Sequence, residues 1–484
     1  MRQFGSSLHH NGMSFFQATV PAGTVLYHGG RDADVPEGLE WLAFEIEHAE
    51  DFARGRLRPK DNSSKATLPM PGPGRAEQWP LRPRQQQSES RSTRASLIAP
   101  GINGGRAISD EWDPDKWIFV SGYLHVYQAT RPLNLVYVDG MAAGKTSIGT
   151  DDAQDFILVG NRTRHFMEDF QRAYDLCAWA EKWQIDGFIR MEPGFEIVYC
   201  NFRDGGVNQV SALHRPRDMS TMEDLEADKF EWVRAVSQRY HGIGGDRVVI
   251  DYSSMVSAFF YPLNLTNPNT TAPELPRLLN ADDDQLAEIK AHIEKATLAK
   301  REKTSQSTNW QGVTDMIVAR YADILLGMVN SDTAEAMKRA LGHQIYTFTD
   351  FSTGDVDWEE SECRCARHYL EGTVTTTTEE ELIYAGIMAT TQLICGTLFQ
   401  AYKLVQTSDS GDESLTGAVS LVRDLMDKLH WSKWKECGGC GPGEVCFIAM
   451  WPFGNVEDHY NPSCTNASAS FDRSSYWDWE WDGI

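Results

Sequence analysis

The sequence predicts an α+β protein: an N-terminal mixed α/β domain, then a mainly α-helical domain closed by a cysteine-rich C-terminal cap. Three observations predict this order. Short apolar β-like runs bounded by Gly and Pro recur over residues 23–202, helical periodicity dominates from residue 281, and Cys, Gly and Trp gather after residue 430. A chain of 484 residues is too long for one core. We therefore expect three regions: 1–215, 216–430 and 431–484.

The N-terminal region begins with a short lead-in, residues 1–22. Residues 23–28 predict a strand, and residues 45–54 predict a helix whose first turn carries acidic residues, where the helix dipole favours them. Residues 54–106 are rich in Arg, Pro, Ser and Gln and lack hydrophobic periodicity. That composition is typical of a long surface insertion without regular structure.

From Asp113 onward the sequence again predicts regular secondary structure. The sequence then predicts two strands, a helix and a hairpin over residues 117–128, 133–138, 162–183, and 185–190 with 195–202. The segment Gly140–Ser147 resembles a phosphate-binding P-loop, but three residues separate Gly140 from Gly144 where that loop has four. We expect a Gly-rich loop at a strand end.

The remaining chain is mostly helical in pattern. Residues 247–263 fit either a strand followed by a turn or a buried helix. We expect helices over residues 219–241, 282–300, 311–328, 332–341, 379–404 and 413–430. The apolar stretch 383–399 is interrupted by Thr and Gln, which favours a buried helix over a membrane span.

Charge and cysteine content narrow the class of protein. The formal net charge of −24 argues against general nucleic-acid binding, which needs a cationic surface. Nine cysteines and five N-x-S/T sequons favour a secreted, disulfide-bonded glycoprotein. The start MRQFGSSLHHNG lacks an apolar signal core, so either the numbering begins at a mature or engineered end or the protein is not secreted; we expect the first.

The cysteines allow two interpretations. Cys437, Cys440, Cys446 and Cys464 fit either disulfides or a zinc site, and we expect disulfides. Cys177 and Cys200 are expected to be free core thiols or a pair, and Cys395 an inert core thiol in the most apolar helix. The pairing cannot be derived from the spacing.

Three stretches in the N-terminal region carry the functional argument: VLYHGG, then WLAFEIEHAEDF, then FEIVY. Their order and type resemble the H-Y-E class of ADP-ribosyltransferase-like domains, over residues 23–202. That class includes mono- and poly-ADP-ribosyltransferases and NAD glycohydrolases. The whole chain also resembles an uncharacterised family of fungal secreted proteins, which implies no function.

The resemblance implies a role for five residues. His28 resembles the histidine that hydrogen-bonds the ribose of the nicotinamide half of NAD, and Gly29 the residue whose backbone holds the carboxamide. Trp41 resembles the tyrosine that stacks on nicotinamide, and Phe52 takes the place of a second aromatic wall. Glu196 resembles the catalytic glutamate. No metal is implied.

Two departures from the family pattern leave the glutamate open. Trp41 stands where the family has tyrosine, and Glu196 directly precedes Ile-Val-Tyr where the stricter motif has one intervening residue. Because strand side chains alternate, a one-residue shift aims Glu196 at the opposite face. Glu192 on the hairpin turn is the alternative, and a bulge after Pro193-Gly194 would restore the aim of Glu196.

The resemblance therefore predicts an enzyme that consumes NAD by cleaving the nicotinamide–ribose bond, as a glycohydrolase or as a transferase with a protein acceptor. A carboxylate near the ribose stabilises the oxocarbenium-like transition state. The alternative is a secreted binding or structural protein on an inactive version of the fold.

Overall fold

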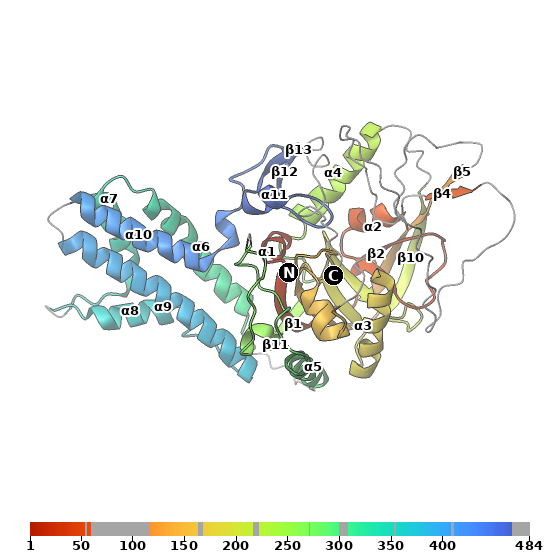
Figure 1. Ribbon diagram of the computed structural model, residues 1–484, viewed down its shortest axis with the longest axis horizontal. Helices are drawn as coiled ribbons and strands as arrows, with labels where there is room; N and C mark the ends of the chain where they lie inside the picture. Colours follow the sequence, from red (N-terminus) through yellow and green to blue (C-terminus); the bar gives the residue numbers. More distant parts are fainter. Residues whose placement is uncertain are drawn as a thin grey trace, which may run out of the picture.

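The computed structural model describes residues 1–53, 56–59, 117–162, 168–215, 222–270, 272–299, 308–352, 355–407 and 411–466. Figure 1 shows a sheet-containing body and, extending from it, an elongated bundle of helices. The fold class is the predicted one: an N-terminal mixed α/β part, a mostly helical part after it, and disulfide-bonded cysteines near the C-terminal end.

One nine-stranded sheet organises the N-terminal body, in the order β10-β6-β2-β3-β9-β8-β7-β1-β11. Only β7 and β8 pair in parallel among these neighbours. The strands are β1 (Asn11–Val20), β2 (Val25–Gly30), β3 (Glu40–Ala43), β6 (Tyr123–Ala129), β7 (Leu133–Gly140), β8 (Gly187–Met191), β9 (Phe195–Tyr199), β10 (Val207–His214) and β11 (Val249–Ser257). The pairing of β2 with β3 is the shortest in this sheet, since only Tyr27 and Ala43 are aligned.

Two segments join this sheet that the sequence did not place in it. The expected lead-in contains β1, which lies between β7 and β11 because its alternating Phe16, Ala18 and Val20 enter the core. Strand β11 lies beyond residue 215, so the sheet extends past the boundary we expected there.

Part of the expected insertion is also regular. Strands β4 (Arg56–Pro59) and β5 (Trp117–Val120) form a separate antiparallel pair. The remainder of residues 54–106 lies outside the described residues. Of the helix expected over residues 162–183, residues 163–167 also lie outside them, and the helix begins at Asp169.

Apolar side chains on both faces of the sheet pack against helices. Ile197 and Tyr199 of β9 face a core closed by α4 and by the strand and loop at residues 445–451. Phe188 and Val198 face a second core closed by α3, α5 and a π-helix. The helices of this body are α1 (Gln3–Leu8), α2 (Ile46–Ala53), the π-helix η1 (Ala153–Val159), α3 (Asp169–Trp183), α4 (Met222–Gln238), the 3₁₀ turn η2 (Ala258–Phe260) and α5 (Asp283–Leu298).

The helical bundle has its own core, distinct from the two that face the sheet. Its helices are α6 (Trp310–Val329), α7 (Ala334–Ile345), η3 (Tyr346–Phe348), α8 (Trp358–Arg367), α9 (Thr378–Thr407) and α10 (Gly411–Leu429). Asn309, Thr333 and Asp357 cap α6, α7 and α8 with side-chain hydrogen bonds to backbone N–H groups. Helix α8 was not predicted, because it is short and strongly polar.

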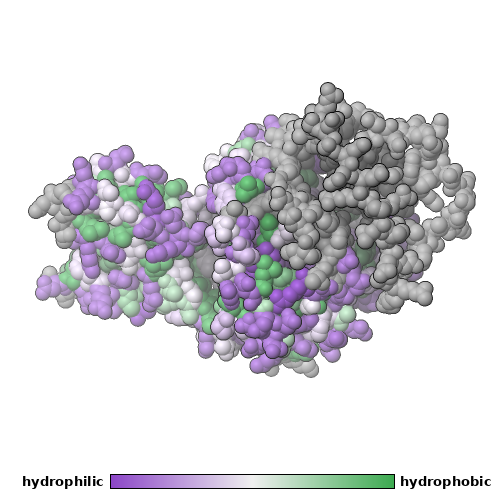
Figure 2. Space-filling model, in the orientation of Figure 1, coloured by the Kyte–Doolittle hydropathy of each residue, from purple (hydrophilic) through white to green (hydrophobic). Residues whose placement is uncertain are grey.

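Helix α9 contains the apolar stretch for which we predicted burial. Ile394, Leu398 and Phe399 are buried in the bundle, but Leu382 and Leu393 are 43% and 38% exposed. By length and composition, Thr378–Gln406 also passes as a membrane-spanning helix; one such helix is weak evidence, since core helices of soluble proteins pass too. Figure 2 shows hydrophilic and hydrophobic residues interspersed over this face of the bundle.

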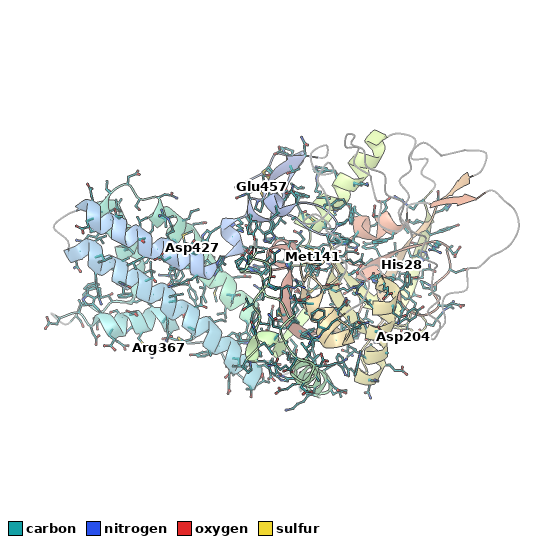
Figure 3. The ribbon with its side chains drawn as sticks, in the orientation of Figure 1. His28, Met141, Asp204, Arg367, Asp427 and Glu457 are labelled. Atoms are coloured by element: carbon teal, nitrogen blue, oxygen red, sulfur yellow. A yellow bond between two sulfur atoms is a disulfide. The ribbon has the colours of Figure 1, made fainter. Side chains whose placement is uncertain are left out.

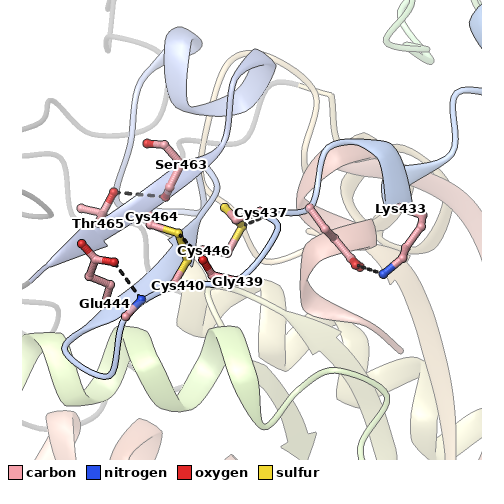
Figure 4. Close-up of a disulfide and its surroundings, with 11 residues drawn as sticks. Lys433, Cys437, Gly439, Cys440, Glu444, Cys446, Ser463, Cys464 and Thr465 are labelled. Atoms are coloured by element: carbon pink, nitrogen blue, oxygen red, sulfur yellow. Dashed lines mark hydrogen bonds and ion pairs between the residues drawn. A yellow bond between two sulfur atoms is a disulfide. The ribbon is translucent and has the colours of Figure 1, made fainter. Parts of the chain in front are cut away.

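The C-terminal cap consists of η4 (Ser432–Trp434), β12 (Glu444–Phe447), α11 (Val456–Tyr460) and β13 (Ser463–Asn466). Two disulfides staple it, Cys437–Cys446 and Cys440–Cys464 (Figure 4). The others are Cys177–Cys200, between α3 and the end of β9, and Cys365–Cys395, between α8 and α9. The prediction that Cys395 is a free thiol is therefore wrong: Cys365 reaches it across the helix interface. The ninth cysteine, Cys363, is free and exposed.

Candidate functional site: a buried charge cluster beside Trp41

The three stretches of the functional argument lie on adjacent strands, β2, β3 and β9. In the β3–β9 pair, Trp41 lies opposite Val198 and Ala43 opposite Glu196. Because alternate side chains share a face, Trp41 and Glu196 project from the same side of the sheet. The structure thus brings these two residues together.

His28 projects from the other side, because β2 aligns Tyr27 with Ala43 and His28 is the next residue. Its ring packs against His125 and Phe202, with centroids 5.4 and 5.8 Å away. Its Nδ1 lies 2.8 Å from the carbonyl oxygen of Trp41, which gives a hydrogen bond between β2 and β3. Figure 3 shows His28 inside the sheet-containing body, away from the bundle.

Gly29 and Phe52 lie beside helix α2. A Cβ at Gly29 would come 2.2 Å from the carbonyl oxygen of Ala49 and 2.6 Å from the amide nitrogen of Ala53. The close approach that this glycine permits is therefore that of α2 to β2. Phe52 is 37% exposed and stacks on His48 at 5.9 Å, one turn back on α2.

Glu196 is held by an arginine from the neighbouring strand. Arg190 of β8 lies directly opposite it, and the guanidinium Nε donates to Glu196 Oε1 at 2.9 Å. The two side chains are 0% and 4% exposed. Burial raises the pKa of Glu196, but Arg190 and His48 together outweigh burial, so the pKa lies below its ordinary value.

The pair belongs to a larger cluster. Arg190 also bonds both oxygens of Asp169, at the start of α3, at 3.1 and 3.0 Å. The ammonium of Lys145 lies 2.6 Å from Glu192 Oε1 and 3.7 Å from Asp169. The indole Nε1 of Trp451 donates to the same Glu192 oxygen at 3.0 Å. Three carboxylates, a lysine and an arginine thus share one buried region.

Burial and neighbouring charges shift the pKa values of the two glutamates in opposite directions. Burial raises the pKa of Glu192; Lys145 opposes this shift, and the carboxylates of Glu196 and Asp169 add to it. Glu196 shifts the other way because it faces a guanidinium. Two carboxyl groups whose environments move their pKa values apart are the arrangement used for acid/base and charge-stabilising roles at glycosidic bonds.

His48 of α2 adds a titratable side chain to this cluster. Its Nε2 lies 3.8 Å from Glu196 Oε2, beyond hydrogen-bond distance, and the ring is 1% exposed. Neither ring nitrogen has a hydrogen-bond partner. Buried polar groups are normally hydrogen-bonded, so a buried imidazole without a hydrogen bond beside a carboxylate calls for a functional explanation.

Partly exposed side chains border the cluster beside Trp41. The indole is half-buried, and Phe170 of α3, itself 46% exposed, meets it edge-on at 4.7 Å. The Arg190 guanidinium lies 6.0 Å from the Trp41 ring centroid. The Asp169 side chain is 23% exposed. Two partly exposed aromatic rings therefore lie beside the charged groups.

Comparisons with known proteins give a family match over the first 229 residues and two relatives that match more of the chain. Residues 1–229 match the family described as the YPL277C N-terminal domain. The chain is similar to an uncharacterised fungal protein family. Uncharacterized protein YPL277C of Saccharomyces cerevisiae is 27% identical over 390 residues, covering 68% of this chain and 73% of that protein. Uncharacterized protein YOR389W of the same yeast is 26% identical over 389 residues, covering 68% and 57%. No solved structure matches.

Sequence reasoning missed most of the cluster. Arg190 had a signal: a lone charge in the apolar strand GFIRM, which needs a buried partner. Lys145 lies in the Gly-rich loop at residues 140–147, which is one residue too short for a P-loop and to which we assigned no function. Asp169 and His48 gave no signal, since helix-start acids and lone histidines are common for other reasons.

His28 makes the stability of the protein depend on pH. Burial is the main reason that its pKa falls from 6.5 to about 4. Between these values the unfolded chain binds a proton that the folded chain does not, so stability falls as pH falls. From pH 7.5 to 5, wild type should lose about 2 kcal/mol more unfolding free energy than His28→Asn.

Denaturation of both proteins at the two pH values measures this difference. Comparing the two chains cancels other groups, such as Glu40, whose pKa burial raises to about 7 with the opposite effect. Equal losses in wild type and variant would show that the pKa of His28 is the same in the folded and the unfolded chain, which would contradict this prediction.

Proposed function

We propose that the N-terminal body cleaves the nicotinamide–ribose bond of NAD and transfers ADP-ribose to water or to an acceptor. One observation carries the proposal: Trp41 and Glu196, far apart in sequence, share one face of adjacent strands, with Arg190 in contact with both. An aromatic ring suits the nicotinamide, and an ionised carboxylate suits the positive charge that develops on the ribose.

The step balances without a redox partner. The bond between the ribose C1′ and the nicotinamide nitrogen breaks, and its electron pair neutralises the positive charge of the pyridinium ring. The oxygen of water or of the acceptor then bonds to C1′ and releases one proton. His48, whose ring nitrogens lack a hydrogen bond and whose Nε2 lies 3.8 Å from Glu196, is the base that takes this proton.

Four further residues have supporting roles in this scheme. Arg190 keeps Glu196 ionised through the 2.9 Å contact. His28 acts as a positioning residue, since its hydrogen bond holds the backbone of Trp41. Lys145 and Trp451 hold Glu192 away from the Glu196 carboxylate.

Free nicotinamide released from NAD by the full chain tests the proposal. We expect release above a buffer blank, and a higher KM with little change in kcat for Trp41→Ala, because stacking serves binding. Leu298→Ala, an exposed change on α5, is the matched control and should behave as wild type. No release beside an active positive control, with the chain folded, would overturn the proposal.

A second candidate rests on a different observation. Glu196 is 3% exposed and already neutralised by Arg190, which suits an inactive version of the fold used for binding. Four disulfides fit an extracellular protein, and Asn264, Asn269 and Asn466 of the sequons are exposed. Saturable heat on titration of NAD into the protein would favour the enzyme. The absence of such heat would favour a secreted binding protein.

A further inference from the structure

The cap gathers four cysteines in a small volume. The sulfurs of Cys437, Cys440 and Cys464, which belong to two different disulfides, all lie within 4.8 Å of one another. Cys446 is bonded to Cys437 and stands directly opposite Cys464 in the β12–β13 pair. Figure 4 shows the four side chains converging between the hairpin and the Gly-rich loop.

This arrangement is close to the one that a tetrahedral metal site needs. Zinc binds thiolate sulfur at about 2.3 Å, which places neighbouring sulfurs at about 3.8 Å. The three sulfurs therefore reach a zinc geometry by shifts of the order of an ångström. The spacing Cys-x2-Cys at 437 and 440 matches the first half of a common ligand pattern for structural zinc, and each hairpin strand adds one cysteine.

One backbone contact in the cap favours a thiolate, and the loop has room for the shift. The backbone N–H of Cys437 donates to Cys446 Sγ at 3.0 Å, a contact that also stabilises a thiolate. A Cβ at Gly438 or Gly439 would meet nothing within 4 Å, so the loop has room to move. All four cysteines are partly exposed and accessible to a reductant.

We propose that the cap is a redox-dependent zinc site, held by two disulfides when oxidised and by one tetrathiolate zinc ion when reduced. Two molecules of a dithiol reductant supply four electrons and four protons, and each becomes a cyclic disulfide. The four thiols then bind Zn²⁺ and release four protons. Because β12 contributes Val445 and Phe447 to the core under the sheet, either state keeps the cap docked on the N-terminal body.

Cobalt titration of the full chain tests this proposal. After reduction with a water-soluble phosphine and removal of oxygen, Co²⁺ should give the visible absorption bands of a tetrahedral thiolate site, bleached by one equivalent of Zn²⁺. The oxidised chain should give none. Cys440→Ser with Cys464→Ser should abolish the bands, whereas Cys177→Ser with Cys200→Ser, which removes the other partly exposed pair, should leave them intact.

Circular dichroism shows whether the reduced chain is folded, with and without Zn²⁺. If the reduced chain stays folded, or loses structure that Zn²⁺ restores, the cobalt bands decide for the proposal. A folded reduced chain without the bands, an unfolded one that Zn²⁺ does not restore, or bands that persist in the Cys440 and Cys464 double variant would each overturn it. None of these readouts depends on NAD.

Discussion

Arg190→Met should destabilise the N-terminal body by about 3–5 kcal/mol, because it leaves buried carboxylates without their counter-ion. Arg190 is 0% exposed and bonds Glu196, Asp169 and the Gln154 side chain. Methionine fills a similar volume, so the loss comes from the unpaired charges rather than from a cavity. Calorimetry suits the measurement, since it separates the transitions of two bodies that need not unfold together.

Two variants identify the cause. Adding Glu196→Gln to Arg190→Met should restore part of the loss, because the double variant no longer buries that lone charge. Arg364→Met is the matched control: its pair with Glu360 is exposed, and its removal should change stability by less than about 1 kcal/mol. An Arg190→Met protein as stable as wild type would show that the cluster rearranges or takes up protons at no cost.

The order of helices and strands could be predicted from the sequence because the spacing of apolar residues differs between the two. The hairpin of β8 and β9 and the helices α6, α9 and α10 lie where apolar spacing placed them. Strand β11 illustrates the limit. Its apolar run allowed a strand or a helix, and only pairing with β1, some 240 residues earlier, decides between them.

The candidate site was predictable only in part, for a similar reason. Sequence order brought Trp41 and Glu196 into one hypothesis, and the β3–β9 register places them on one face. The same alternation puts His28 on the opposite face, which spacing along the chain could not reveal. Lys145 and Asp169 join Glu192 and Arg190 only through tertiary contact.

The second large effect concerns catalysis. Glu196→Gln keeps the shape of the side chain and an oxygen that accepts from Arg190, but removes the negative charge. If that charge stabilises the oxocarbenium-like state, the rate of NAD cleavage should fall on the order of 10²–10³-fold. Glu192→Gln keeps acceptors for Lys145 and Trp451 and should lower the rate by less than about tenfold.

Glu192→Gln is therefore the matched control for Glu196→Gln: both replace a buried glutamate of the same cluster by its amide. Circular dichroism and the melting temperature report whether each variant keeps its fold. A folded Glu192→Gln protein that loses activity would assign the catalytic role to the hairpin turn instead of β9.

The most direct test of the account is the rate of nicotinamide release from NAD by wild type, Glu196→Gln and Glu192→Gln, measured side by side. The account predicts measurable release by wild type, near-complete loss in Glu196→Gln and retained activity in Glu192→Gln. Release by Glu196→Gln at the wild-type rate, or no release by a folded wild-type chain, would contradict it.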